Sequence, residues 1–122
     1  MKYRLVGTAE GQIDRILLES ARGFGIQAAG RYHSLMIAAI AAIAESPFYP
    51  GSRPVRRVAG VRVYPLRLAR GLVDRRHRVA QPRHLILYRV GSDGVVEVLG
   101  VIHDRMMLAR AARRNQRDAQ NR

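Results

Sequence analysis

Hydrophobic and polar positions in the first half of the chain predict one short strand followed by two helices. Residues 2–7 alternate apolar and charged side chains, as an exposed strand does. Between residues 9 and 22, isoleucines and leucines recur every three or four positions, which is typical of an amphipathic helix with Thr8 at its N-cap. Residues 26–45 carry a longer apolar stripe rich in alanine, and Pro47 stops it. Because only a short glycine-containing link separates the two segments, the sequence predicts an antiparallel helical hairpin.

The second half of the chain predicts a small antiparallel sheet. Residues 58–68 have a strand pattern, but Pro65 cannot donate to a ladder, so we expect an edge position or a bulge there. Residues 84–90 are almost all apolar, which is typical of a central strand buried on both faces. Residues 95–102 follow a polar turn and form the partner strand of a hairpin. The segment 69–82 is predicted to be a loop or a strand extension.

The order of these elements predicts an α+β domain. It is β-α-α-β-β-β with a short C-terminal helix, so a helical hairpin should pack on a small, mostly antiparallel sheet. We expect one domain over residues 1–112. Residues 113–122 are polar and charged, and we expect them to form a frayed tail.

Composition narrows the class of protein. The chain has no cysteine, which excludes disulfides and thiolate metal sites. His77 and His84 have no second ligand at a convincing spacing, so no metal site is predicted. The first residues lack the apolar core of a secretion signal, and the longest apolar stretch, residues 35–44, is about half the length that spans a bilayer. We therefore predict a cytoplasmic protein without membrane contact.

Positive charge is concentrated in the second half of the chain. Residues 1–52 carry five basic and four acidic side chains, whereas residues 53–122 carry seventeen and five, within a formal net charge of +13. Lys2 is the only lysine, so arginine supplies the excess. A GC-rich genome would account for arginine in place of lysine, but not for the excess over acids. The charge therefore indicates an acidic partner, either protein or nucleic acid.

Four segments of the chain resemble the toxins of type II toxin–antitoxin modules in the RelE/ParE superfamily, and the ParE branch most closely. They are TAEGQIDRI, FGIQAAGRYHSLMIAAIAAIAESPFYPG, RHLILYRV and VVEVLGVIHDRMML. The last is the most specific, because ParE-like chains commonly end a strand with a leucine– or isoleucine–histidine pair followed by an arginine and a methionine. Those positions here are Ile102, His103, Arg105 and Met106. The resemblance covers residues 3–112, and the basic middle, residues 53–82, is longer than in compact members.

The resemblance implies the same β-α-α-β-β-β fold, a cognate acidic antitoxin that wraps the toxin, and a role in plasmid stabilisation. ParE-like members inhibit DNA gyrase, whereas RelE-like members cleave mRNA in the ribosome. Contact with DNA would then pass through the antitoxin. Our leading prediction is a toxin that inhibits gyrase by binding, with no catalytic residue and no cofactor. The alternatives are a ribosome-dependent mRNA endonuclease and a non-toxic basic interaction module.

Candidate site residues follow from this comparison. Those for target binding are His103, Arg105, Met106, Met107 and Arg110. Those for antitoxin binding are Tyr32, Arg62, Tyr64, Arg67 and Arg89. A nuclease would use proton-transfer and phosphate-binding groups, for which the candidates are His103, Arg105, Arg89 and Arg62. Two features disfavour the nuclease: no aromatic residue follows Tyr88, and the paired lysines that such nucleases often present are missing.

Overall fold

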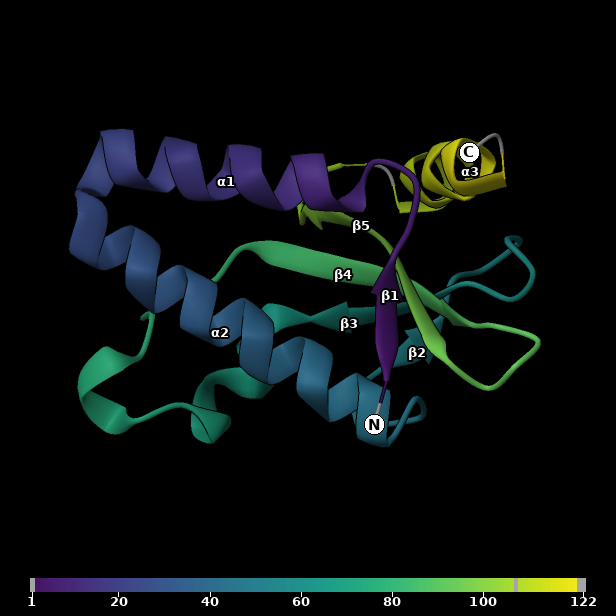
Figure 1. Cartoon of the computed structure of the whole chain (residues 1–122), viewed down its shortest axis with the longest axis horizontal. Coiled ribbons are helices and arrows are strands. Elements are labelled where there is room, and N and C mark those ends of the chain that lie inside the picture. The colour runs from purple at the N-terminus through teal and green to yellow at the C-terminus, as the bar shows by residue number, and fades with distance from the viewer. Residues whose placement is uncertain (1, 107, 121–122) are drawn as a thin grey trace.

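A five-stranded sheet with helices on both faces forms the centre of the protein (Figure 1). The computed structural model describes residues 2–106 and 108–120. In sheet order the strands are β1 (Tyr3–Leu5), β5 (Val96–His103), β4 (His84–Val90), β3 (Arg62–Pro65) and β2 (Arg53–Pro54). β1 pairs with β5 in parallel, and the other pairings are antiparallel. The predicted α+β class with a mostly antiparallel sheet is therefore confirmed, and the apolar segment β4 lies in the middle of the sheet as expected.

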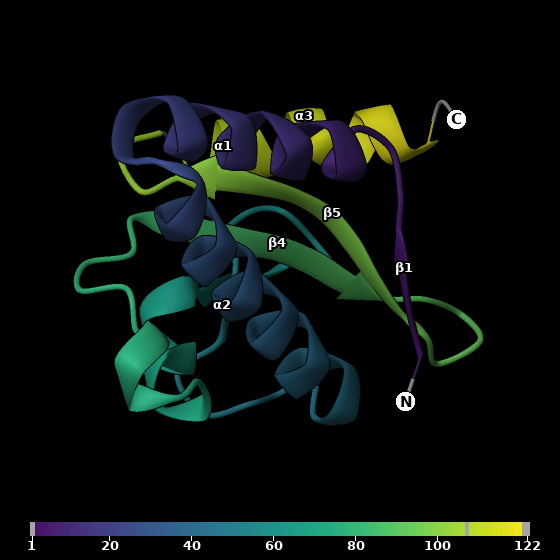
Figure 2. The same cartoon turned by 60° about the vertical axis from the view of Figure 1, so that its left-hand side comes forward.

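The predicted helical hairpin covers one face of the sheet (Figure 2). It consists of α1 (Ala9–Phe24) and α2 (Ile26–Glu45). Gly25 joins them with a φ of 94°, in the left-handed region that residues with a side chain rarely adopt. Alternate residues of the strands pack under the hairpin, and the residues between them face the opposite layer. The first set includes Tyr64, Ile86, Tyr88 and Val98, and the second includes Val63, Leu87 and Leu99.

The opposite face is covered by α3 (Leu108–Gln120), which is longer than the sequence predicts. The expected frayed tail from residue 113 is wrong as far as Gln120, and the predicted domain limit at residue 112 falls inside this helix. The reason is tertiary packing: Ala111, Ala112 and Asn115 are buried against the sheet. Polar composition alone could not reveal that one of the polar residues is an interior side chain.

Asn115 belongs to a network of hydrogen bonds that joins three elements. The Gln12 side chain on α1 donates to Asn115 Oδ1 at 2.8 Å and accepts from the Val101 amide of β5 at 2.9 Å. Thr8 stands at the predicted N-cap, but its hydroxyl makes no cap hydrogen bond and instead accepts from Gln12. A Cβ added to Gly100 would lie 2.5 Å from the side-chain oxygens of both Gln12 and Asn115, so any other residue at this position would displace the two amides.

The segment after β3 differs from its prediction. β3 is shorter than the predicted 58–68 strand, and Pro65 is its last residue, beyond the reach of β2. Residues 69–82 were expected to be a loop or a strand extension, but two 3-10 helices occupy much of this region: η1 (Leu66–Leu72) and η2 (Arg75–His77). Leu66 and Ala69, three residues apart, lie on the same side of η1 and are fully buried in the core cluster that contains α2 residues. This apolar spacing fits a three-residue turn better than the period of a strand.

Candidate functional site

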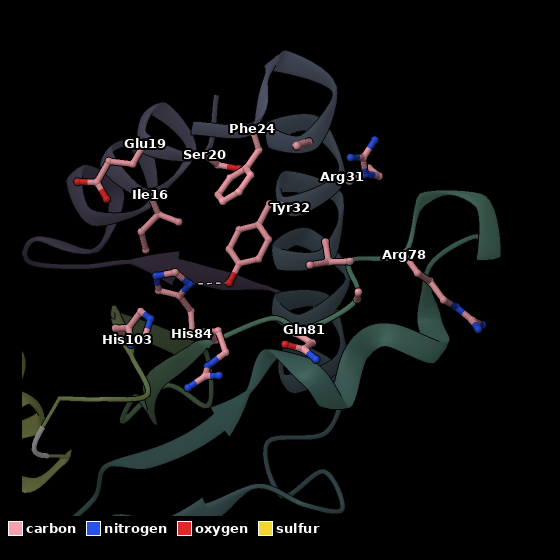
Figure 3. Close-up of a pocket in the computed structure, with 14 residues that line it drawn as sticks. Ile16, Glu19, Ser20, Phe24, Arg31, Tyr32, Arg78, Gln81, His84 and His103 are labelled. Carbon is pink, nitrogen blue, oxygen red and sulfur yellow. Dashed lines mark hydrogen bonds between the residues drawn. The ribbon is translucent and has the colours of Figure 1, made fainter. Parts of the chain in front are cut away.

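A groove lies beside the connection between α1 and α2, over the ends of β4 and β5 (Figure 3). We call it the hairpin groove; its volume is about 740 Å³. Its apolar lining includes Ile16, Phe24, Ala28, Val79 and Ala80. Three arginines and one glutamate add charge to it: Arg31, Arg78, Arg83 and Glu19. Phe24 is 83% exposed, so a large apolar side chain stands uncovered at this site. An apolar groove with a mainly cationic rim can bind an amphipathic segment that carries acidic side chains.

Two histidines and a tyrosine meet at the base of the hairpin groove (Figure 3). His84 and His103 lie opposite each other in the β4–β5 register, and their ring centroids are 5.3 Å apart. The Tyr32 hydroxyl from α2 lies 2.5 Å from His84 Nδ1. The sequence showed each residue separately but gave no sign of this cluster.

Tyr32, which is buried, and His84, which is partly buried, are electrically neutral at pH 7. Burial, with a smaller contribution from His103, lowers the pKa of His84 to about 4. Burial raises the pKa of Tyr32 to about 12. Tyr32 therefore keeps its proton and can donate a hydrogen bond to Nδ1 of a neutral His84. This contact ties α2 to β4 and leaves little capacity for proton transfer near neutral pH.

His103 is connected to the turn that follows β5. Its Nδ1 atom lies 3.1 Å from the Arg105 amide and 3.1 Å from Asp104 Oδ1. A neutral ring accepts from the amide, whereas a protonated ring donates to the carboxylate. Asp104 also forms an ion pair with Arg83 at 2.8 Å, which links the turn to the start of β4. The rim of the hairpin groove is thus continuous with the β5–α3 connection.

The candidate target-binding residues follow one another along that connection. Arg105 and Met106 are exposed in the turn, and Arg110 is exposed on α3. His103 lines the hairpin groove. Met107 lies outside the residues that the structure describes. The described candidates therefore lie close together in the chain, and all of them except His103 are exposed.

The candidate antitoxin-binding residues do not form one surface. Tyr64 is fully buried beneath the hairpin, so it is not available to a partner in this fold. Side chains alternate along β3, and Tyr64 falls on the face that the helical hairpin covers. Arg62 lies over the Phe48 ring at 4.7 Å, and Arg89 pairs with Glu97 at 2.6 Å. Arg67 is exposed on η1, and only Tyr32 reaches the hairpin groove.

The candidate nuclease residues are also separated. His103 is the last residue of β5. Arg89 lies on β4 opposite Glu97, and Glu97 is six residues before His103 on β5. At about 3.3 Å per residue, this places the two roughly 20 Å apart along the sheet. Arg62 lies farther across the sheet, opposite Tyr88. The fold therefore does not assemble these four side chains around one phosphate.

Residues 2–106 and 108–120 contain no group of three or more histidine, aspartate or glutamate side chains placed to hold a metal ion. Within the same part of the chain, no helix has the length and apolar character needed to cross a membrane.

Comparison with known proteins identifies a family over most of the chain. The matching family model is described as the ParE toxin of the type II toxin-antitoxin system, parDE, and it covers residues 3–108. No curated protein matches the chain.

Proposed function

The chain belongs to the family of ParE toxins of type II toxin–antitoxin systems, and we propose that it inhibits DNA gyrase by binding and that a cognate acidic antitoxin neutralises it. The observation that carries the proposal is the family match, which spans both the hairpin groove and the turn after β5. This role places the protein in the cytoplasm, where gyrase acts.

The hairpin groove is the proposed docking site of the antitoxin. Its apolar lining and exposed Phe24 supply the anchors that give affinity, because covering one large apolar side chain stabilises a complex by about 1.5–3 kcal/mol. Arg31, Arg78 and Arg83 outnumber the single acid Glu19, so an acidic segment is favoured over a basic one. This assignment replaces the five-residue set predicted from sequence and retains only Tyr32 from it.

The turn after β5 is the proposed contact with gyrase. Arg105 and Met106 are exposed there, and His103 joins the turn to the hairpin groove. An antitoxin bound in the groove would cover part of the same surface. Neutralisation would then follow from direct exclusion of the target, without any change in the fold of the toxin.

Binding fits the site better than bond cleavage does. Phosphodiester cleavage requires an acid, a base and cations around one phosphate. His103 and Arg105 lie together at the end of β5, but Arg62 and Arg89 lie elsewhere in the sheet, and Arg89 is already paired with Glu97. These observations support an inhibitor that makes or breaks no covalent bond.

A supercoiling assay with purified gyrase tests the target. Wild-type protein should block supercoiling of relaxed plasmid, and Arg105→Glu should weaken the block by tenfold or more. Arg15→Glu makes the same charge change on the exposed surface of α1 and should inhibit as wild type does. Unimpaired supercoiling, combined with cleavage of ribosome-bound mRNA by the wild-type protein, would replace this proposal with the nuclease. Normal growth during expression without the antitoxin would instead support a non-toxic module.

A binding assay with the protein encoded by the neighbouring reading frame tests the groove. Phe24→Ser should weaken the complex by about 10- to 100-fold, which is the equivalent of losing one buried aromatic anchor. Phe48→Ser removes a phenylalanine that is also exposed, at 70%, but lies outside the groove. This control should change affinity less than twofold. Equal losses in both variants would show that the antitoxin docks elsewhere.

A further inference from the structure

One face of α3 is made almost entirely of arginine. Arg110, Arg113, Arg114 and Arg117 are exposed and spaced at i, i+3, i+4 and i+7, so they form a single stripe along the helix. The opposite stripe is buried against the sheet and includes Ala111, Ala112 and Asn115. Packing of the buried stripe therefore fixes the rotation of α3 about its own axis, so that the four arginines face the solvent.

A second pair of arginines is held next to this stripe by the turn between β2 and β3. Val55 and Val58 are buried in the same cluster as the inner face of α3, and the Gln116 side chain donates to the Ala59 carbonyl at 3.2 Å. Arg56 and Arg57 lie between the two valines and are exposed. Arg57 has a φ of 64°, an uncommon conformation for arginine that is associated with functional sites.

Together these six residues form what we call the arginine surface: Arg56, Arg57, Arg110, Arg113, Arg114 and Arg117. Among the described residues, none of the six takes part in an ion pair. None of the large exposed apolar side chains of the described chain lies on α3 or between residues 55 and 61. The surface thus offers concentrated positive charge without an apolar anchor.

This composition discriminates between two classes of acidic partner. Exposed ion pairs with a protein are each worth only about 0.2–1 kcal/mol, so an acidic peptide needs apolar anchors as well. Such anchors are found at the hairpin groove and not here. Nucleic acid differs, because each neutralised phosphate releases a condensed counterion and binding needs no apolar contact. We propose that the arginine surface binds the phosphate backbone of duplex nucleic acid, independently of base sequence.

The geometry suits a rigid duplex. Arg117 lies seven positions after Arg110, which is about 10 Å along the helix axis. B-DNA carries one charge per roughly 1.7 Å of its axis, so the stripe spans several phosphates at once. Guanidinium groups bind phosphate oxygens through two parallel hydrogen bonds, which favours arginine for this purpose.

This inference goes beyond the proposed function and stands apart from it. Gyrase inhibition and antitoxin docking concern the turn after β5 and the hairpin groove. The arginine surface would add direct contact with a nucleic acid, such as the duplex on which a topoisomerase works. Loss of duplex binding and loss of gyrase inhibition can therefore be measured separately.

Fluorescence anisotropy with a labelled duplex of arbitrary sequence tests the inference. The full-length protein should bind with an affinity that falls steeply between 50 and 200 mM salt. Arg113→Gln/Arg117→Gln removes two phosphate contacts, so the slope of log K against log salt should fall by about 1.8 in magnitude. Because this electrostatic contribution vanishes near 1 M salt, the same difference amounts to roughly 60-fold in affinity at 0.1 M.

Arg15→Gln/Arg22→Gln is the matched control, because it removes two exposed arginines from α1 and lowers the net charge equally. This control should bind duplex within twofold of wild type. Arg57→Gly is a second test, since glycine accepts the positive φ, and the slope should fall by about 0.9 without loss of fold. Thermal unfolding by circular dichroism confirms that each variant is folded.

Three results would overturn the inference. The first is equal weakening by the α1 control, which would mean that net charge alone attracts the duplex. The second is a flat salt dependence of wild-type binding. The third is displacement of the duplex by polyglutamate at an equal concentration of charge, which would assign the surface to an acidic protein.

Discussion

Between pH 7 and pH 5 the wild-type protein should lose stability as His84 becomes protonated. Replacing His84 with asparagine should abolish most of that loss. His84 is partly buried, and its Nδ1 atom accepts a hydrogen bond from Tyr32. The Oδ1 atom of asparagine can take over that acceptor role but cannot be protonated. The substitution therefore separates the titration of the ring from its hydrogen bond.

The sign and size of the effect follow from the depressed pKa of His84. The folded-state pKa is about 4 and the ordinary value is 6.5, so the unfolded chain binds more protons between these values. The contribution to stability is complete above pH 6.5 and is lost as the pH falls toward 4. Integration from pH 7 to pH 5 gives a loss of about 1.8 kcal/mol. Solvent screening at a partly exposed ring reduces this to about 1 kcal/mol.

Titration of Asp93 and Glu97 contributes little to the change in stability between pH 7 and pH 5. The pKa values of Asp93 and Glu97 are lowered below their ordinary values of 3.8 and 4.5 by hydrogen bonds, so the stability that these carboxylates contribute is lost below this window. Asp93 accepts chiefly from the Val95 amide and Glu97 from Arg89.

Urea denaturation followed by circular dichroism at pH 7, 6 and 5 measures the effect. The midpoint of the wild type should fall by roughly 0.5–1 M urea over this range. His84→Asn should show less than half of that fall, whereas His33→Asn, at an exposed position on α2, should retain the full fall. A wild-type slope that persists in His84→Asn would refute the reasoning, because another group would then cause the loss.

Two further predictions concern stability. Gly100→Ala should destabilise the protein by about 1–3 kcal/mol in urea denaturation, because the added Cβ would meet the Gln12 and Asn115 side chains. An unchanged midpoint of unfolding would mean that both amides move aside easily. Tyr64→Phe should leave stability unchanged or raise it by up to about 1 kcal/mol, because the buried Tyr64 hydroxyl has no hydrogen-bond partner among the described residues. Tyr88→Phe should lower stability by about 1 kcal/mol, because the Tyr88 hydroxyl donates a hydrogen bond to the Pro47 carbonyl. A larger loss in Tyr64→Phe than in Tyr88→Phe would contradict this assignment.

Local sequence patterns were sufficient to predict an element where the apolar spacing within that one segment indicates its type and its burial. The apolar run of residues 84–90 predicted a central strand, and β4 lies between two neighbours in the sheet. The apolar stripe of residues 26–45 predicted α2 with its limits. The candidate target-binding residues lie close together because they follow one another in the chain, and their role in binding stays a prediction.

Local patterns failed where burial depends on distant partners. Tyr64 alternates with Val63 in β3, and nothing nearby tells which of the two faces the hairpin, since both faces of this sheet are covered. Asn115 was assigned to a solvated tail, yet its amide is satisfied by Gln12, more than one hundred positions earlier. A polar residue is recognised as buried only when its hydrogen-bond partner is known.

The sequence by itself therefore determined the helical hairpin, the central strand, the excess of positive charge and the resemblance to a toxin family, since each depends on spacing or composition along the chain. Tertiary structure alone decided which residues meet. Counting from the turn, where Val90 pairs with Val96, His84 would lie opposite Ile102; an irregularity at Leu87 and Tyr88 shifts the register by one residue and places His84 opposite His103. Such a shift reverses the face of every later side chain, and it arises from packing against both layers of the fold, which no local pattern contains.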